Sequence, residues 1–513
     1  MTDPFDFGQG QPPAEPPAEQ PQSRRAARGS GPKRGRGTAS SGKPSPAETD
    51  RKGLLASFAA HPNAWLFSAI GVVFLLLATG SVFAGMAIGA TPSAAITPVP
   101  TTAAPRATPS GISTATPLRT CSVAGQAANT ALGSFSGTVI NPTTGEVLFD
   151  RNGSTGVATA SVMKLLTSAT ALYDLGPDYT FKTTVYAGTT PGSVVLVGGG
   201  DPTLHVASSG GTVYKGAPTI EDLAGQVKSA MGSQPITSVV LDATMWNPAD
   251  NWDPSWPVTE RTQGYQPLIT ALMVDGDRAD PSAQNSPRST DPVGAAGAAF
   301  LQALGLPADT PISKGSAIGG SQQLGQVQSQ PISTLIGQML PVSDNTLAEM
   351  MARVSSKVSG RDGSSGSLTP TYTSALTSYG LDATGLIIKD GSGESNLDAV
   401  APSLVAKLMV QVLANPAGKN LDLIYNALPV AGKTGTLASR FSGPNAVARG
   451  AVNAKTGSIA TAYALAGIVH AADGTALSFA FFAEGKLNAN SAMTALDTIT
   501  TAVFTCGNNL SNN

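Results

Sequence analysis

Ser161 and Lys164 have the residue types and the spacing of a serine nucleophile and its base. They lie three residues apart in "ASVMKLLTS", where apolar residues recur at helical spacing. That spacing places both side chains on one helix face, about one turn apart. Burial lowers the pKa of a lysine, which can then accept a serine proton, and the helix start offers N–H groups to a developing negative charge. An ordinary helix start beside a solvated lysine shows the same pattern, and the S-x-x-K match at Ser40 arises by chance.

Ser343 and Asn345 form a second candidate group in "PVSDNTLAEM". The hydroxyl could pass a proton between Lys164 and a leaving amine, and the amide could hold a substrate carbonyl or fix Lys164. Ser343 and Asp344 also suit the capping position before the helix expected after them. Capping and catalysis are compatible, so both interpretations stay open here.

The tripeptide Lys-Thr-Gly occurs twice, at Lys433 and at Lys455. A lysine beside a threonine hydroxyl can bind a carboxylate, and the glycine lets a substrate backbone approach a strand closely. Two strand patterns and a helical pattern follow Lys455, whereas Lys433 precedes the loop-like "LASRFSGPNAVARG". We expect Lys433 to lie in a connecting segment and assign substrate binding to Lys455, Thr456, Gly457 and Ser458.

The elements that must position these residues form an α/β pattern. Residues 133–153 predict a hairpin, and residues 159–176 predict a helix that carries Ser161 and Lys164. Residues 182–330 mix short strands with helices. Near the C-terminus, three successive strands and a closing helix are predicted after residue 449.

Histidine and cysteine are too scarce here for metal or histidine-based catalysis. The three histidines are His61, His205 and His470, and none lies in a recognisable triad motif. No Cys/His cluster has metal-ligand spacing, so we expect neither a metal nor a cofactor. Charged residues make up 12% and the net charge is −2, which gives no case for a nucleic-acid partner.

In chain order, S-x-x-K, S-D-N and K-T-G match the motif set of penicillin-binding proteins and β-lactamases. Together with "VGGGDPTL", "DGSGES", "LPVAGKTGTLASRF" and "NAKTGSIATAYALAGIVH", they make the sequence resemble the D-Ala-D-Ala carboxypeptidases of peptidase family S13, the class C low-molecular-mass penicillin-binding proteins. The resemblance covers about residues 121–506. It agrees with the choice of Lys455, because the family motif follows an alanine, as at Ala454.

The resemblance implies an α/β penicillin-binding-protein and β-lactamase-like transpeptidase fold with a large mixed α/β insert. We expect the catalytic domain at residues 121–181 and 331–507, and the insert at residues 182–330. In the family the insert helps to shape the site for the diamino acid of the stem peptide, and Asp242 is our candidate for its ammonium group. A surface or capping role is the alternative for Asp242. Glu394 stands where the family often has an apolar residue, and its effect stays open.

The resemblance further implies a serine D-Ala-D-Ala carboxypeptidase, with endopeptidase cleavage of cross-links as an added activity. Lys164 would take the Ser161 proton, and the N–H groups of Ser161 and Ser458 would stabilise the oxyanion. The expected partners are peptidoglycan stem peptides and β-lactams, which would acylate Ser161. The alternatives are a β-lactamase, disfavoured by the insert and the missing E-x-x-L-N loop, and a non-catalytic wall-binding protein, disfavoured by the intact motifs.

The N-terminal part predicts export and membrane anchoring. Residues 1–63 are rich in Pro, Gly, Ala and Ser with a basic patch, which predicts a disordered cytoplasmic tail rather than a nucleic-acid arm. Residues 64–90 carry no charge and, as a helix of about 40 Å, would span a bilayer. Residues 91–120 predict a Pro/Thr-rich linker. The catalytic part would then lie outside a cell membrane on a single span with a cytoplasmic N-terminus, and cleavage near Ala95 is the alternative.

Cys121 and Cys506 stand at the two ends of the expected globular part. An exported domain meets oxidising conditions, and domain termini often lie close together, so a disulfide between them is our favoured interpretation. Two buried free thiols are the alternative.

Overall fold

The computed structural model of this protein describes residues 118–207 and 209–512. The described elements all belong to one compact unit, Ser113–Asn513. Within these two ranges, no helix is both long and apolar enough to cross a bilayer. The predicted tail (1–63), membrane span (64–90) and most of the linker (91–117) lie outside the described residues.

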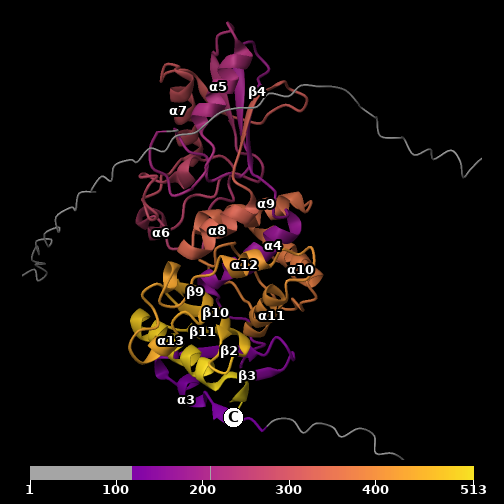
Figure 1. The fold of residues 1–513 in the computed structure, drawn as a ribbon. Coiled ribbons are helices and arrows are strands. Elements are labelled where there is room, and N and C mark those ends of the chain that lie inside the picture. The colour runs from indigo at the N-terminus through magenta and orange to yellow at the C-terminus, as the bar shows by residue number, and fades with distance from the viewer. Residues whose placement is uncertain (1–117, 208, 513) are drawn as a thin grey trace, which may run out of the picture. The chain divides into compact units, whose positions relative to one another are not determined.

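An antiparallel sheet carries the motif at Lys455. Its strands are β9 (Val452–Ile459), β10 (Ala462–His470) and β11 (Ala476–Glu484), paired in the order β11-β10-β9. The hairpin of β2 (Ser134–Ile140) and β3 (Val147–Arg151) lies beside β11 (Figure 1), where a bridge joins Gly133 to Glu484. Nearly every residue of β10 and β11 is buried, because α11 (Pro402–Ala414) and α13 (Ala489–Cys506) both pack against this sheet.

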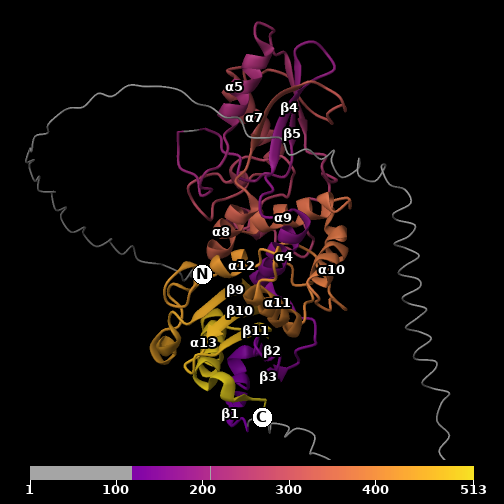
Figure 2. The same ribbon diagram turned by 45° about the vertical axis from the view of Figure 1, so that its right-hand side comes forward.

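A group of helices surrounds the helix that carries Lys164. This helix, α4 (Met163–Asp174), lies among α9, α10 and α12 in both ribbon views (Figures 1 and 2). Ten of its twelve residues are buried, from Met163 to Leu172, which fits a central helix rather than a surface one. Its neighbours are α8 (Ile332–Val342), α9 (Asn345–Val358), α10 (Leu368–Ser378) and α12 (Asp422–Asn426).

A five-stranded sheet lies inside the segment predicted as the insert. Its strand order is β7-β6-β5-β4-β8, with parallel pairs at β5–β6 and β6–β7 and antiparallel pairs at β4–β5 and β4–β8. Helix α5 packs on β8, and α7 packs on β6 and on α5. The elements are β4 (Lys182–Ala187), β5 (Ser193–Gly198), α5 (Ile220–Met231), β6 (Ser238–Asp242), α6 (Thr259–Gln263), α7 (Pro292–Leu304), β7 (Ile312–Lys314) and β8 (Gln323–Gln328).

Two hydrophobic clusters divide the interior, and they do not follow the predicted insert boundary. One cluster runs from the insert, with Leu196 of β5 and Phe300 of α7, through α4 and α9 to α11. The other lies between the sheet and α13 and includes Phe479 and Phe481. Because the first cluster is continuous across residues 181 and 331, the insert is packed onto the helices by apolar contact.

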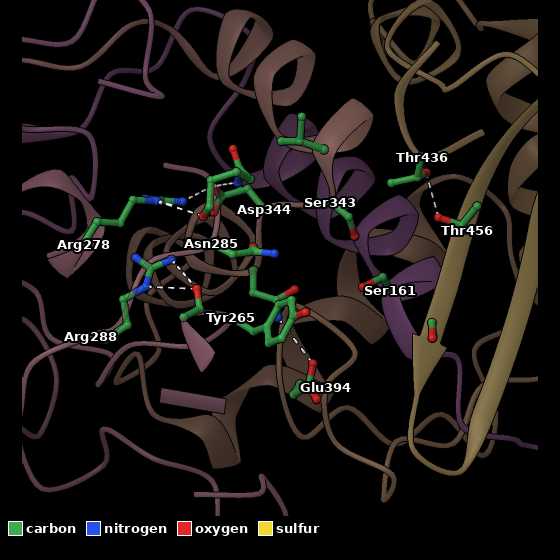
Figure 3. Close-up of a pocket in the computed structure, with 15 residues that line it drawn as sticks. Ser161, Tyr265, Arg278, Asn285, Arg288, Ser343, Asp344, Glu394, Thr436 and Thr456 are labelled. Atoms are coloured by element: carbon green, nitrogen blue, oxygen red, sulfur yellow. Dashed lines mark hydrogen bonds and ion pairs between the residues drawn. The ribbon is translucent and has the colours of Figure 1, made fainter. Parts of the chain in front are cut away.

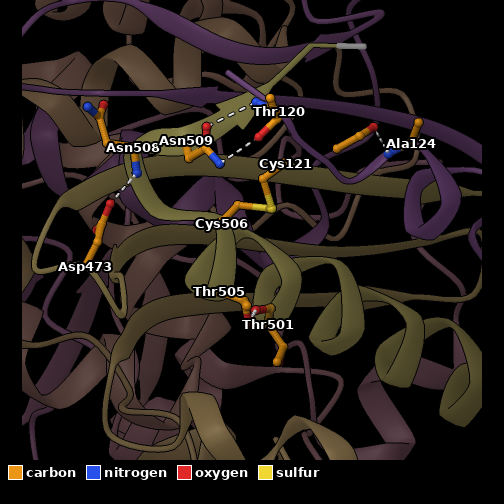
Figure 4. The surroundings of a disulfide bond; sticks show 10 residues. Thr120, Cys121, Ala124, Asp473, Thr501, Thr505, Cys506, Asn508 and Asn509 are labelled. Atoms are coloured by element: carbon orange, nitrogen blue, oxygen red, sulfur yellow. Dashed lines mark hydrogen bonds between the residues drawn. A yellow bond between two sulfur atoms is a disulfide. The ribbon is translucent and has the colours of Figure 1, made fainter. Parts of the chain in front are cut away.

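The two ends of the described chain meet at a disulfide (Figure 4). Cys121 and Cys506 are bonded, with 5.5 Å between their Cα atoms. Beside this bond, β1 (Cys121–Ser122) pairs in parallel with β12 (Leu510–Ser511). The Thr120 N–H also donates to Asn509 Oδ1 at 3.1 Å. The structure therefore contains the disulfide rather than two free thiols.

Candidate active site

Ser161 lies in a short 3-10 turn, Ala160–Val162, that leads directly into α4. Ala160 has a φ of 45°, a conformation that residues with a Cβ rarely adopt. Its carbonyl oxygen lies so close to Gly393 that a Cβ on residue 393 would be 1.9 Å away. The strained turn is therefore held from outside by the segment around Gly393, which fixes the position of Ser161.

Lys164 lies in the first turn of α4, whereas Ser161 lies just before this helix rather than inside it as predicted, and the Lys164 side chain is completely buried. Its Nζ donates to Ser161 Oγ (2.9 Å), Asn345 Oδ1 (2.7 Å) and the Ser392 carbonyl oxygen (2.8 Å). Burial lowers the pKa of Lys164 to about 8, although nearby carboxylates, chiefly Glu394, oppose the shift. An amine with a pKa near neutrality is suited to take the proton of the hydroxyl that it contacts.

The segment from Ser343 to Asn345 connects α8 to α9. Ser343 ends α8 in the left-handed region, with a φ of 63°. Asp344 caps α9 by accepting a hydrogen bond from the Leu347 N–H at 2.9 Å. The cap places Asn345 in the first turn of α9, where its amide reaches Lys164. Asp344 is therefore the capping residue, which leaves the side chains of its two neighbours available for chemistry.

Asp344 also joins this segment to the insert, a contact that the sequence analysis missed. Arg278 Nη2 donates to Asp344 Oδ2 at 2.7 Å, and Gln284 Nε2 donates to the same oxygen at 3.0 Å. Burial opposes the charge of Asp344, yet the Arg278 guanidinium keeps its pKa below the ordinary value. These partners lie at least 60 residues from Asp344 and in no motif, so no local pattern marks them.

Lys455 lies on β9 opposite Ala466 of β10, and its side chain is completely buried. Its Nζ donates to Ser343 Oγ at 2.8 Å and to the Thr456 carbonyl oxygen at 2.9 Å. Burial and the charge of Lys164 lower the pKa of Lys455 well below its ordinary value. Lys455 therefore connects the strand to Ser343, while the predicted contact with a carboxylate stays a prediction.

The second Lys-Thr-Gly, at Lys433, forms a turn instead of a strand. Lys433 is exposed, and the Thr434 hydroxyl accepts a hydrogen bond from the Val430 N–H at 2.9 Å. The residue after the tripeptide, Thr436, has its hydroxyl 2.8 Å from that of Thr456. The two copies are thus neighbours in space, and the segment around Lys433 is a connection, as expected.

These side chains meet around one cavity (Figure 3). Ser161 and Ser343 point toward one another on its wall, and Thr456 lies across from them on β9. Lys164 and Lys455 do not line it but lie buried behind these hydroxyl groups. The lining includes Ser161, Ser343, Asn345, Glu394, Thr436, Thr456 and Ser458, together with Tyr265, Arg278, Asn285 and Arg288 from the insert.

A second cavity beside the first has an acidic wall. It shares Tyr265, Glu394 and Ser458 with the first cavity and adds Glu260 and Tyr463. Burial raises the pKa of Glu260. Burial, followed by the charge of Glu260, raises the pKa of Glu394 to about 7. A cationic group entering this cavity would relieve the repulsion between the two carboxylates.

Asp242 lines neither of these cavities, and its predicted contact with the substrate ammonium group stays a prediction. It ends β6, where its Oδ1 accepts hydrogen bonds from the Thr244 N–H (2.9 Å) and hydroxyl (2.7 Å). Its Oδ2 accepts from the Ala317 N–H at 2.7 Å. Both oxygens are thus used in fixing the loops after the strand, and Glu260 is the acidic insert residue at the site.

The described histidines lie elsewhere. His205 Nδ1 is 2.6 Å from Asp275 Oδ1, and His470 Nε2 is 2.7 Å from the Tyr425 hydroxyl. Neither lines the cavity of Ser161. In the described part of the chain, no group of three His, Cys, Asp or Glu residues could hold a metal ion.

Comparison with known proteins gives matches over most of the chain. The family described as D-Ala-D-Ala carboxypeptidase 3 (S13) matches residues 120–297 and 283–503. The Carboxypeptidase DacB of Mycolicibacterium smegmatis is 34% identical over 462 residues, which cover 87% of this chain and 99% of that protein. The Carboxypeptidase Rv3627c of Mycobacterium tuberculosis is 35% identical over 428 residues, which cover 81% and 88%.

Among solved structures, the fold is similar to that of penicillin binding protein 4 from Haemophilus influenzae. The TM-score is 0.60 at 20% identity, over 72% of this chain and 94% of that one. A structure of the same protein complexed with a β-lactam gives a TM-score of 0.56. This likeness confirms the predicted mixed α/β penicillin-binding-protein fold.

Proposed function

The chain belongs to the D-Ala-D-Ala carboxypeptidase 3 (S13) family, and from that premise we propose that Ser161 removes the terminal D-Ala of peptidoglycan stem peptides through an acyl-enzyme. The observation that carries the proposal is the 2.9 Å contact between Ser161 Oγ and the Nζ of the buried Lys164. Neither described histidine lines the cavity, and a buried amine next to a hydroxyl is the arrangement expected of a lysine base.

In the first step, the neutral amine of Lys164 takes the Ser161 hydroxyl proton while Oγ bonds to the carbonyl carbon of the D-Ala-D-Ala bond. The carbonyl oxygen becomes an oxyanion, which the backbone N–H groups of Ser161 and Ser458 would stabilise. The C–N bond then breaks, and the departing D-Ala amine receives a proton. Water attacks the resulting ester and returns Ser161 to its free form.

Ser343 is placed to deliver that proton to the leaving amine. Its hydroxyl accepts a hydrogen bond from Lys455 and points toward Ser161 on the same wall of the cavity (Figure 3). The hydroxyl can therefore pass a proton from the lysine side to the nitrogen that leaves. Asn345 keeps Lys164 pointed at Ser161 through its amide oxygen.

The terminal carboxylate of the substrate would lie against β9. The hydroxyl groups of Thr456 and Ser458 line the cavity, and the amine of Lys455 is buried behind them. An entering carboxylate would favour the protonated form of Lys455, whose pKa is lowered by burial and by the charge of Lys164. A β-lactam carries the same carboxylate beside a strained amide, so it should acylate Ser161.

The side chain of the stem-peptide diamino acid would extend into the second cavity. Glu260 and Glu394 supply a negative wall there, and Tyr463 supplies an aromatic surface. A substrate ammonium near these carboxylates would be attracted by both charges. The same machinery would also cleave cross-links, as an endopeptidase, when the leaving amine belongs to a second peptide.

We also propose that residues 64–90 anchor the enzyme to the cell membrane with the catalytic part outside. The support is the uncharged apolar run and the basic residues before it. The disulfide agrees with an oxidising compartment. Removal of residues 1–90 should release the protein from the membrane fraction without loss of peptidase activity.

The test is mass spectrometry of purified muropeptides after incubation with the enzyme, together with labelling by a fluorescent penicillin. Loss of one D-Ala identifies a carboxypeptidase, and conversion of dimers to monomers identifies an endopeptidase. Ser161→Ala should abolish product and label, whereas Ser40→Ala, the chance match, should keep both. Folded wild-type protein that takes no label would refute the proposal, and rapid turnover of nitrocefin would instead indicate a β-lactamase.

A further inference from the structure

Glu394 lies on a turn that the structure holds in one conformation. Asp390 accepts hydrogen bonds from the N–H groups of Gly393 and Ser395, and from Trp256 Nε1 at 2.7 Å. On the same turn, the Ser392 carbonyl oxygen accepts from Lys164. The turn that carries Glu394 is thus fixed to the base itself, and Glu394 lines both the cavity of Ser161 and the acidic cavity beside it.

A chain of hydrogen bonds runs from Glu394 to the nucleophile. Asn345 Nδ2 donates to Glu394 Oε2 at 3.3 Å, and Asn345 Oδ1 accepts from Lys164 Nζ at 2.7 Å. Lys164 Nζ in turn donates to Ser161 Oγ. An ionised carboxylate can only accept hydrogen bonds, so it selects the NH₂ end of the amide. The oxygen end must then face Lys164.

The charge of Glu394 also acts on the base directly. After burial, which lowers the pKa of Lys164, the Glu394 carboxylate is the largest influence and opposes the lowering. The charged groups that face Glu394 are Glu260 of α6, Asp390 of its own turn and Lys164 of α4, with the Asn345 amide from α9. Burial, Glu260 and Asp390 raise the pKa of Glu394 to about 7, so its charge changes near neutral pH.

We propose that Glu394 is a positioning residue for acylation, which turns the Asn345 amide toward Lys164 and sets a negative charge beside the base. This inference rests on the proposed function, because it assigns Lys164 the role of proton acceptor. The two effects oppose each other. Orientation of the amide helps the reaction, whereas the negative charge favours protonated Lys164, which cannot accept a proton.

The direction in which the pH profile of acylation shifts depends on the protonation state of Lys164. Acylation requires neutral Lys164, so its rate rises as the pH passes upward through the pKa of this lysine. Loss of the Glu394 charge lowers that pKa and moves the rise to lower pH. A change that also removes the acceptor for Asn345 lowers the plateau rate, because the amide is no longer held.

The experiment compares Glu394→Gln with Glu394→Leu in the acylation rate by a fluorescent penicillin between about pH 5 and pH 10. Glu394→Gln keeps the size of the side chain and an acceptor oxygen. The rise of the acylation rate should therefore shift about one pH unit to the acid side, with a plateau rate within about threefold of wild type. Glu394→Leu should shift the rise to the acid side by the same amount and lower the plateau acylation rate by roughly tenfold. The exposed Asp309→Asn in the insert is the control for loss of one remote negative charge.

Thermal unfolding of each variant identifies a general loss of fold, which would lower the labelled fraction without moving the pH profile. Profiles for both variants that overlay the wild type would overturn the proposal. Equal losses of the plateau acylation rate in Glu394→Gln and Glu394→Leu, without any shift of the pH profile, would also overturn the proposal. They would indicate that Glu394 only supports the fold. Failure of the proposed function is distinguishable, because wild-type Ser161 would then take no label at any pH.

Discussion

The two copies of Lys-Thr-Gly have the same three residues and very different surroundings. Lys455 is buried on β9, and its Nζ contacts Ser343. Lys433 is exposed in a turn, where its Nζ lies over Gly450. A tripeptide therefore does not define a site. What distinguishes the copies is the strand that carries one of them past the Ser161 turn, and the predictions below test that difference.

The largest effect should come from Lys455→Ala. The substitution removes the donor to Ser343 and the amine behind Thr456 and Ser458, whose protonated form would bind the substrate carboxylate. We expect acylation by penicillin to fall by roughly 10²–10³-fold, the range for loss of one preorganised group at a reacting centre. Stopped-flow labelling gives the rate. An acylation rate near that of wild type would show that Lys455 has no part in the site.

Gly457→Ala should have the next largest effect, because β9 passes very close to the nucleophile turn. A Cβ on residue 457 would lie 2.7 Å from the Thr159 carbonyl oxygen and 3.0 Å from the Ala160 Cβ. The strand must move away, and a displacement of about 1 Å in a catalytic group can cost up to 10²-fold in rate. We expect acylation to fall by roughly 10- to 100-fold. This account would be contradicted if the free energy of unfolding fell by more than the activation free energy of acylation rose.

The equivalent change in the other copy, Gly435→Ala, should act on stability more than on rate. Gly435 has a φ of 55°, and a Cβ there would lie 2.6 Å from the Pro341 carbonyl oxygen. The left-handed backbone alone costs an ordinary residue about 1–2 kcal/mol. Urea denaturation should show a loss of about this size, and acylation should fall less than in Gly457→Ala. Pro341 lies in the last turn of α8, just before Ser343. An acylation loss equal to that of Gly457→Ala would therefore mean that the turn at Gly435 also sets the position of Ser343.

The smallest effect should come from Lys433→Ala. Its side chain is exposed and lies outside the residues that line the cavity of Ser161. Surface substitutions of this kind usually change free energies by no more than about 0.5 kcal/mol, which is about twofold in rate. Labelling should therefore match wild type within about twofold. If Lys433→Ala were as damaging as Lys455→Ala, the assignment of the two copies would be overturned.

Much of the fold was predictable because the deciding patterns are local. The helix that carries Lys164, the strand of Lys455 and the hairpin at residues 133–153 each show their own periodicity in the sequence, whereas the short turn that holds Ser161 before the helix does not. The motifs S-x-x-K, S-D-N and K-T-G are each weak alone, but together they occur in the chain order of one family. Their residues could therefore be assigned to one site. No similar pattern exists for the contact of Arg278 with Asp344 or of Glu394 with Asn345, because each joins segments that only the fold brings together.

At Asp242 the local pattern predicts the strand but does not decide the role of the residue that ends it. An aspartate that follows "SVVL" is found at the end of a strand, where a carboxylate can either cap the next turn or face a ligand. Its hydrogen bonds to Thr244 and Ala317 show that it fixes the local loops. Glu260, by contrast, lies on a five-residue helix with no motif, and only its position beside Tyr265 in the folded insert brings it to the cavity.

The bond between Cys121 and Cys506 has a mechanical consequence for a chain that continues before residue 118. A pull on the N-terminal segment would reach Arg119 and Thr120, which are hydrogen-bonded to Glu146 and Asn509, and then Cys121, where the disulfide leads to the end of α13. Parallel pairing of β1 with β12 shares the tension at the same junction. None of these joining residues lies on α4 or β9. If residues 64–90 anchor the enzyme as we propose, its attachment point is thus fastened to both ends of the described chain by residues outside the elements that carry Ser161, Lys164 and Lys455.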